Sequence, residues 1–326
     1  MVNSDSQRKI AAILRVLEEA GRPLGSTKIA RGLRVAGIDL EQRMVRNYLD
    51  AMDAAGLTVT LGRRGRELTE QGRREFATAF VIDKIGFVDA RADELAYNMT
   101  LDLTRYRGTV IVNLSTIPAA YLDDARRQIT TVIRARLGMG HYGILATSGG
   151  GVPGLAIAAG DAVIGTVCSL TLNGLLRAEG IPTLSRFAGL LEIRDGQPRR
   201  FTHAIQYAGT TLDPIEIFIK AGMTRVLDAA RTGTGLVGAS FREVPAVALP
   251  HVQKVIQQMD EAGLGGLALL GEPSRPLLEI PVSHGRAGLI VAAGLNPLAA
   301  VQEAGIPTEN RAMARLCEFG DLVPLV

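Results

Sequence analysis

The stretch Gly108–Pro118 reads GTVIVNLSTIP, and a related stretch, GLVGASFREVP, occupies Gly235–Pro245. Each is a largely apolar run that ends at a proline, which predicts a β-strand followed by a turn. A helical pattern follows each stretch and ends at a Leu-Gly pair, which begins at Leu137 in the first case and at Leu264 in the second. The chain therefore contains a strand-turn-helix unit twice.

The similarity continues beyond these units, with shorter strings in the same order. Gly165-Thr-Val-Cys168 corresponds to Gly288-Leu-Ile-Val291, and a Gly-Ile-Pro-Thr string follows in both cases. We therefore predict an internally duplicated α/β domain over residues 81–326, with two similar lobes at about 81–200 and 201–326. Small ligands usually bind in clefts at such junctions. The alternative is that the repeat records only the history of the scaffold.

Length and composition limit the class of protein. The chain has 326 residues, 47% of them hydrophobic, which is enough for two or three domains with cores of their own. The N-terminus is polar and no apolar run approaches the roughly 20 residues of a membrane helix, so we expect neither a secretory signal nor a membrane span. The two cysteines, Cys168 and Cys317, are too few for a disulfide framework. The resulting expectation is a cytoplasmic protein.

Charge is distributed unevenly along the chain. Residues 1–80 contain 14 Lys and Arg against 10 Asp and Glu, whereas residues 81–326 contain 22 against 23. A small basic module joined to a larger, near-neutral body is typical of a nucleic-acid-binding domain attached to a domain with another role. A solvated basic face is the alternative on charge alone.

The basic module predicts three helices followed by a hairpin. Apolar residues recur at helical spacing in Ser6–Ala20, in Ser26–Val35 and again after Asp39, which we expect to cap the third helix. Two short β-like runs then flank the tip Gly62-Arg-Arg-Gly65. This order resembles a winged helix-turn-helix, which we assign to residues 1–80.

One face of the third predicted helix has side chains suited to DNA. Arginine pairs with guanine, and asparagine or glutamine with adenine, through two hydrogen bonds. Arginines of the hairpin would add contacts to phosphate groups. The predicted DNA-binding residues are Ser26, Thr27, Lys28, Gln42, Arg43, Arg46, Asn47, Arg63, Arg64 and Arg66. The alternative is a solvated helix face in a module that mediates protein contacts.

No catalytic constellation is visible in the sequence. Three Gly-x-Gly-x-x-Gly strings, which begin at Gly138, Gly149 and Gly233, lack the strand-to-helix context of a dinucleotide site. The four histidines are far apart and have no cysteine partners at ligand spacing, so we expect neither a metal nor a cofactor. We predict that the protein is not an enzyme. An enzyme with a regulatory winged helix is the alternative, because catalytic residues can be distant in sequence.

Small polar residues beside glycines are the remaining candidates for ligand binding. Backbone N–H groups and hydroxyls in such loops can hold a carboxylate or a phosphate, and an arginine can add a bidentate contact. The predicted effector-binding residues are Thr147, Ser148, Gly165, Thr166, Cys168, Ser169, Arg186, Tyr207, Thr210, Thr211, Asp213 and Asn296. Ordinary turn chemistry is the alternative for any one of these loops.

Several longer strings carry a family resemblance. They are Gly165-Thr-Val-Cys-Ser169, Gly180-Ile-Pro-Thr183, Gly189-Leu-Leu-Glu192, Tyr207-Ala-Gly-Thr-Thr-Leu-Asp-Pro214, Gly222-Met-Thr224 and Gly294-Leu-Asn-Pro297. With these strings the body resembles the effector domain of the NrpR nitrogen-responsive repressors of methanogenic archaea and their bacterial relatives. The N-terminal module resembles the winged helix of the same family, so the resemblance covers essentially the whole chain.

The resemblance implies a homodimeric transcriptional repressor that binds a palindromic double-stranded DNA operator and is released by 2-oxoglutarate, a small anionic effector. Well-known archaeal members carry two effector domains or divide them between two proteins, whereas this chain has one. This difference leaves open whether the chain governs nitrogen assimilation, governs another pathway in response to a different metabolite, or acts with a second protein. A protein-interaction adaptor that uses the winged helix for dimerisation is a separate alternative.

Overall fold

The computed structural model describes residues 4–35, 38–79, 87–148, 155 and 157–326 of the chain. The chain divides into two compact units, Met1–Gly86 and Phe87–Val326. The first unit contains one hydrophobic core, and the second contains two large ones. Among the described residues, no helix is both long and apolar enough to cross a membrane.

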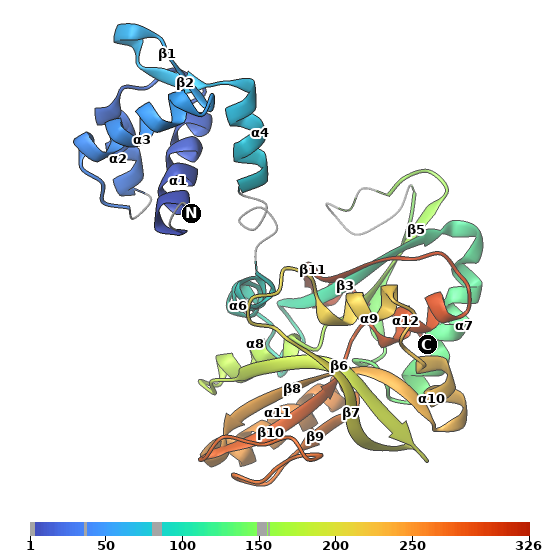
Figure 1. Ribbon diagram of the computed structural model, residues 1–326. Coiled ribbons are helices and arrows are strands. Elements are labelled where there is room, and N and C mark those ends of the chain that lie inside the picture. The colour runs from blue at the N-terminus through green and yellow to red at the C-terminus, as the bar shows by residue number, and fades with distance from the viewer. Residues whose placement is uncertain (1–3, 36–37, 80–86, 149–154, 156) are drawn as a thin grey trace. The chain divides into compact units, whose positions relative to one another are not determined.

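The first unit is a winged helix-turn-helix, as predicted (Figure 1). Its elements are α1 (Ser4–Ala20), α2 (Ser26–Val35), α3 (Gln42–Ala54), β1 (Thr58–Thr60), β2 (Arg66–Leu68) and α4 (Glu70–Ala79). Leu14 of α1, Ile29 of α2 and Leu49 of α3 are buried together in the core. The helical spacing of apolar residues seen in the sequence is therefore the spacing that lets the first three helices share one core.

The wing is joined to the rest of this unit by backbone hydrogen bonds. β1 and β2 are antiparallel, and Leu24 pairs with Arg66, where each N–H donates to the other residue's carbonyl at 2.9 and 3.0 Å. Gly65 has a φ of 102°, and a Cβ at this position would lie 2.3 Å from the backbone carbonyl of Leu24. The tip of the wing therefore depends on a residue without a side chain.

The second unit contains two five-stranded antiparallel sheets (Figure 1). In order along the chain, its elements are α6 (Val88–Asn98), β3 (Thr109–Pro118), α7 (Leu122–Arg134), β4 (Tyr142–Thr147), β5 (Asp161–Val167), α8 (Thr171–Ala178), β6 (Leu184–Arg194), β7 (Gln197–Gln206), α9 (Pro214–Lys220), α10 (Val226–Thr232), β8 (Gly235–Pro245), α11 (Leu249–Glu261), β9 (Ala268–Leu270), β10 (Arg286–Ala292), α12 (Asn296–Glu303), β11 (Glu309–Glu318) and β12 (Val323–Pro324). The strand orders are β11-β3-β5-β4-β12 and β7-β6-β8-β10-β9.

The duplication predicted from the sequence is present as a repeated order of elements. β3, α7, β4, β5, α8 and β6 correspond to β8, α11, β9, β10, α12 and β11. The first strand of each repeat ends at a proline, Pro118 or Pro245, and a short 3-10 turn leads from it into the helix. Proline has no N–H to continue a strand ladder, which explains why both strands end there.

The two lobes are not consecutive halves of the chain, because the repeats exchange a strand. β6 of the first repeat pairs with β8 of the second, and Leu190 lies opposite Gly238. β11 of the second repeat pairs with β3 of the first, and Leu316 lies opposite Ile111. The predicted boundary between lobes near residue 200 is therefore wrong. Each repeat contributes its last long strand to the sheet of the other, which ties the repeats into one unit.

Two hydrophobic cores hold the second unit together. One contains buried residues of α7, α9, α10 and α12, and the other contains buried residues of α8 and α11. Both cores take residues from both sheets, because β3 and β10 contribute to each. The two sheets of the second unit therefore share their apolar packing.

Candidate functional site

The exposed face of α3 carries the side chains predicted to read DNA. Val45, Leu49 and Met52 are buried against the core of the unit. The residues on the exposed side are Gln42, Arg43, Arg46 and Asn47. This arrangement is what a recognition helix requires, since its inner face packs on the protein while the outer face stays free for the major groove.

The predicted start of this helix is wrong by two residues. Asp39 does not cap α3 but lies in an exposed ion pair with Arg34, with 3.4 Å between Oδ1 and Nε. Glu41 occupies the N-cap position and makes no side-chain hydrogen bond to the helix. α3 therefore begins at Gln42, whose side chain contacts the start of α2.

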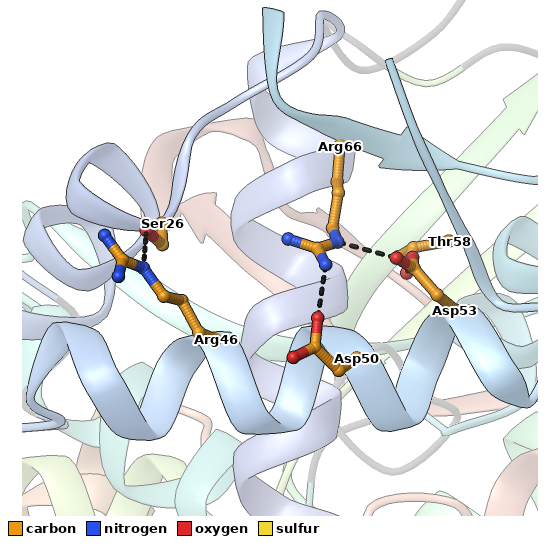
Figure 2. A network of polar contacts seen from close by, with 6 residues as sticks. All are labelled: Ser26, Arg46, Asp50, Asp53, Thr58 and Arg66. Carbon is orange, nitrogen blue, oxygen red and sulfur yellow. Dashed lines mark hydrogen bonds and ion pairs between the residues drawn. The ribbon is translucent and has the colours of Figure 1, made fainter. Parts of the chain in front are cut away.

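Ser26 and Thr27, at the start of α2, contact the start of α3 through their hydroxyl groups. Gln42 Nε2 donates to Thr27 Oγ1 at 2.7 Å and to Ser26 Oγ at 3.2 Å, and Arg46 Nε donates to Ser26 Oγ at 3.3 Å. Figure 2 shows the Arg46–Ser26 contact. These hydrogen bonds hold the long side chains of α3 in defined positions, and they bring four of the predicted DNA-binding residues together.

Arg66 has a different place from the one predicted. Its guanidinium pairs with Asp50 and, at 2.7 Å, with Asp53, and only 21% of its side chain is exposed (Figure 2). Thr58 Oγ1 donates a further hydrogen bond to Asp53 at 2.5 Å. With two carboxylates on its guanidinium, Arg66 fastens the wing to α3 rather than offering its charge to phosphate. Arg63 and Arg64, at the exposed tip of the wing, and Lys28 on α2 keep the predicted exposure.

The second unit encloses a cavity of about 320 Å³, the size of a small metabolite site. Four of the predicted effector-binding residues line it: Cys168, Ser169, Tyr207 and Asp213. Lining residues that the sequence analysis missed include Asn113, Asn173, Ser185, Ser240 and Arg242. The lining residues come from α6, β3, α8, β8 and β11, from the starts of β6 and α9, and from the segments that follow β5, β7 and β10.

Both repeats contribute to the cavity, but with different residues. In the alignment of GTVIVNLSTIP with GLVGASFREVP, Asn113 corresponds to Ser240 and Ser115 corresponds to Arg242. Asn113 and Ser240 both line the cavity, whereas of the second pair only Arg242 does. The signal in the sequence is the charged pair Arg242-Glu243, which stands where the first copy of the repeated strand has the uncharged pair Ser115-Thr116.

Arg242 is the most unusual side chain of the cavity. It is 2% exposed, its Nη1 donates to the carbonyl oxygen of Ser169 at 3.0 Å, and its Nη2 donates to Ser169 Oγ at 2.9 Å. Its Nε is buried, and within the described part of the chain neither a hydrogen-bond acceptor for Nε nor a carboxylate paired with the guanidinium is present. Burial lowers the pKa of Arg242, but a guanidinium remains charged at neutral pH. The cavity wall therefore contains a buried guanidinium that forms no ion pair among the described residues, together with the carboxyl groups of Asp89, Asp93 and Asp213.

The other titratable groups of the wall are shifted toward their neutral forms. Burial raises the pKa of the Cys168 thiol to about 11 and also raises the pKa of Tyr207. Burial, together with the nearby Glu216, raises the pKa of Asp213 to about 6. Cys168 is consequently a poor nucleophile. Asp213 also caps α9, where its Oδ1 accepts hydrogen bonds from the N–H groups of Ile215 and Glu216 at 2.8 and 3.2 Å.

Two predicted effector-binding residues have structural partners instead. Arg186 pairs with the fully buried Glu243 and does not line the cavity. Asn296 is fully buried and makes three hydrogen bonds, one from the N–H of Gly238 to its Oδ1 and two from its Nδ2 to the carbonyls of Leu137 and Gly238. Instead of lining the cavity, Arg186 and Asn296 hold strands and loops of the second unit together.

The remaining predicted residues lie outside the cavity lining. Thr166 Oγ1 accepts a hydrogen bond from Asn113 at 3.4 Å, and the neighbouring Gly165 packs closely on Ile144. Thr210 Oγ1 donates to the carbonyl of Leu212 at 2.9 Å, which is local turn chemistry. The last three are exposed or partly exposed: Thr147, Ser148 and Thr211.

A winged helix with an exposed polar and basic helix, followed by a duplicated α/β unit with a metabolite-sized cavity, defines a transcriptional regulator with an attached regulatory domain. The second unit matches the family model of the NrpR regulatory domains NRD1 and 2 over residues 85–323, and residues 11–76 match the model of the ribonuclease R winged-helix domain. The chain belongs to the NrpR family of nitrogen regulators.

Individual relatives agree with this assignment. The chain is 33% identical over 329 residues to the global nitrogen regulator NrpRI of Methanosarcina mazei, with 98% of each protein covered. It is 26% identical over 310 residues to the global nitrogen regulator NrpR of Methanococcus maripaludis, and this match covers 95% of the chain but 54% of that longer protein. These relatives are named as regulators, and the chain is a regulator rather than an enzyme.

A solved structure has the same fold as the second unit. It is the crystal structure of a nitrogen repressor-like protein from Methanococcus jannaschii, with a TM-score of 0.63 and 26% sequence identity. The match covers 74% of this chain and 99% of that one.

Proposed function

We propose that this chain is a homodimeric repressor that binds a palindromic double-stranded DNA operator through α3 and the wing, and that a small anionic metabolite in the cavity controls this binding. The observation that carries the proposal is Arg242, a buried guanidinium in the wall of the cavity that forms no ion pair among the described residues. Leaving a buried charge unpaired costs free energy, and a bound carboxylate offsets this cost by pairing with it.

The winged helix supports the DNA-binding half of the proposal. Arg43, Arg46 and Asn47 project from the exposed face of α3, and Arg63 and Arg64 are exposed at the wing tip. The first set suits base edges in the major groove, and the second suits phosphates.

The chemistry of the cavity wall supports a carboxylate-bearing effector. Arg242, Tyr207 and Asn113 line one cavity and carry hydrogen-bond donors, and Asp89, Asp93 and Asp213 line it as well. Tyr207 keeps its proton, because burial raises its pKa. 2-Oxoglutarate is the effector that the family resemblance implies, and relatives of the chain are named as nitrogen regulators.

The proposed control is a difference in affinity between two states. Two chains that pair through their second units would set two recognition helices about 34 Å apart, one turn of DNA. In a second form of the dimer the two recognition helices would have a different spacing and would not fit the operator. An effector that binds this form more tightly therefore releases the DNA. A tenfold preference for that form supplies about 1.4 kcal/mol per site, and a dimer has two sites.

Fluorescence anisotropy of the protein with its own upstream intergenic DNA tests both halves. We expect tight binding that millimolar 2-oxoglutarate weakens and that succinate and glutamate leave unchanged. The double variant Arg43→Ala/Arg46→Ala should lose operator specificity, and Arg22→Ala, an exposed arginine outside α3, is its matched control. Operator specificity that survives the double variant would refute the recognition-helix assignment, and binding that no carboxylate weakens would refute effector control.

A further inference from the structure

α6 is the first element of the second unit along the chain, and it forms part of the cavity wall. Asp89 and Asp93 lie four residues apart on one face of α6, and both line the cavity. On another face, Val88 is buried in a cluster that includes Cys168 and Met313, which are cavity residues as well. α6 therefore connects the cavity with the segment that leads to the winged helix.

The start of α6 is tied to the loop after β7. The N–H of Val88 donates to the carbonyl of Thr210 at 2.9 Å. Tyr207 and Asp213, on either side of Thr210 in this loop, line the cavity. A shift of the loop around a ligand would therefore act on the first turn of α6.

Arg91 ties α6 to a second part of the wall, the bulge in β11. Its Nε donates to the carbonyl of Met313 and its Nη2 donates to the carbonyl of Ala314, both at 3.1 Å. The register of β11 against β3 shifts between Arg311 and Arg315, and Met313 has a φ of 47°. The strand ladder is interrupted here, so the guanidinium of Arg91 supplies partners that the neighbouring strand does not.

Two further side chains hold the same bulge. The N–H of Met313 donates to Asn113 Oδ1 at 3.1 Å, and Glu216 accepts a hydrogen bond from the N–H of Ala312. Asn113 and Met313 both line the cavity, as Arg242 does. A continuous set of hydrogen bonds therefore runs from Asn113 through the backbone of Met313 to Arg91.

We propose that Arg91 is a positioning residue that couples the cavity to the DNA-binding unit: by holding the β11 bulge, it makes α6 shift together with the wall when a ligand occupies the cavity. The proposal rests on the function proposed above. Arg91 itself does not line the cavity. Loss of its side chain should therefore leave both DNA binding and ligand binding in place and remove the link between them.

The test compares the operator Kd with and without millimolar 2-oxoglutarate in the full chain. Arg91→Gln removes the charged two-carbonyl contact, and Arg91→Lys keeps one charged donor. Arg105→Gln is the matched control, because Arg105 is exposed and contacts Asp102 at 3.5 Å. We expect 2-oxoglutarate to raise the Kd about 10-fold or more in the wild type and in Arg105→Gln. In Arg91→Gln the ratio of the operator Kd with 2-oxoglutarate to the Kd without it should fall to near 1, while calorimetry shows unchanged 2-oxoglutarate affinity. In Arg91→Lys this ratio should lie between the values for Arg91→Gln and the wild type.

Hydrogen exchange gives a second measurement that a purely structural role would not move. In the wild type, 2-oxoglutarate should change exchange both in residues 168–170 of the wall and in α6, whereas in Arg91→Gln only the wall should respond. An Arg91→Gln protein with a wild-type ratio and a wild-type response of α6 would overturn the assignment. A wild-type protein that binds the operator without any response to 2-oxoglutarate would overturn effector control by this compound, and the role of Arg91 with it.

Discussion

Arg242 donates two hydrogen bonds to Ser169, one to its carbonyl and one to its hydroxyl, and both residues line the cavity. The contact fixes the guanidinium plane, because both Nη atoms are held by one residue that follows β5. The remaining polar edge of the plane, at Nε, has no partner within the described residues. The position equivalent to Arg242 in β3 is Ser115, so this cation is present in one copy of the duplicated strand and absent from the other.

Arg242→Met should abolish most of the effector affinity. Hydrogen bonds to a charged group contribute about 1.5–3 kcal/mol each, so the Kd for 2-oxoglutarate should rise about 10- to 100-fold in isothermal titration calorimetry. Arg242→Lys keeps the charge but cannot reproduce the fork, and its affinity should lie between the two. Arg105→Met controls for loss of an exposed arginine. Unchanged affinity in a folded Arg242→Met protein would show that the effector binds elsewhere.

Asp213 predicts a pH dependence of stability. Its folded-state pKa of about 6 lies above the ordinary value of 3.8, so the folded protein holds a proton that the unfolded chain has released. The corresponding stability is present at low pH and is lost as the pH rises through about 6. Asp213→Asn keeps a residue that caps α9 well and removes the titration. It should therefore stabilise the protein by about 1 kcal/mol more at pH 7.5 than at pH 5.

Urea unfolding followed by tyrosine fluorescence measures this difference, because the chain has no tryptophan and five of its six tyrosines lie beyond residue 86. Asp195→Asn, in the exposed turn between β6 and β7, is the control and should change stability equally at both pH values. An Asp213→Asn effect that is the same at pH 5 and pH 7.5 would contradict the raised pKa.

Substitutions of Arg66 and Arg64 should have different effects, although the two residues are two positions apart, because we expect Arg66 to be structural and Arg64 to bind DNA. Arg66→Met removes the guanidinium from Asp50 and from Asp53, which keeps only its hydrogen bond from Thr58, and should destabilise the first unit by about 1–3 kcal/mol. Hydrogen exchange of the β1 and β2 amides measures this loss. Arg64→Met should leave that exchange unchanged and lower the slope of log Kd against log salt for DNA by about 1. If both variants lowered the slope of log Kd against log salt equally, Arg66 would also contact DNA.

The winged helix could be predicted from the sequence because its information is local. The burial of Val45, Leu49 and Met52 follows from helical spacing, and the wing tip follows from two glycines around two arginines. The partners of Arg66 could not be predicted in this way, since Asp50 and Asp53 reach it only once the wing folds back on α3.

The second unit was predictable only in outline. Repeated strings indicated the duplicated α/β order, but no local pattern says that β6 pairs with β8 rather than with its own repeat. The cavity depends on that exchange, because it gathers residues of both repeats. For the same reason Arg186 could not be distinguished from Arg242 in advance: what separates them is Glu243, which pairs with Arg186 and not with Arg242.

Asn173 and Asn296 occupy equivalent positions in the two repeats and should respond oppositely to the same substitution. Asn296 satisfies the backbone of Gly238, whereas the corresponding backbone of Ile111 exchanges hydrogen bonds at 3.3 Å with the hydroxyl of Thr171. Asn173 is thereby free to line the cavity, where its Nδ2 donates to Ser185 at 3.1 Å and its Oδ1 is buried without a partner among the described residues.

Asn296→Ala should cost about 2–4 kcal/mol of unfolding free energy, because it leaves several buried backbone groups unsatisfied. Asn173→Ala should cost less than about 1 kcal/mol in the same urea experiment, but it should weaken 2-oxoglutarate binding in calorimetry about 5-fold or more, as loss of one hydrogen bond does. Each variant is the matched control of the other. If Asn173→Ala lost stability as Asn296→Ala does and kept its ligand affinity, the two copies would share one structural role and the cavity would not use Asn173.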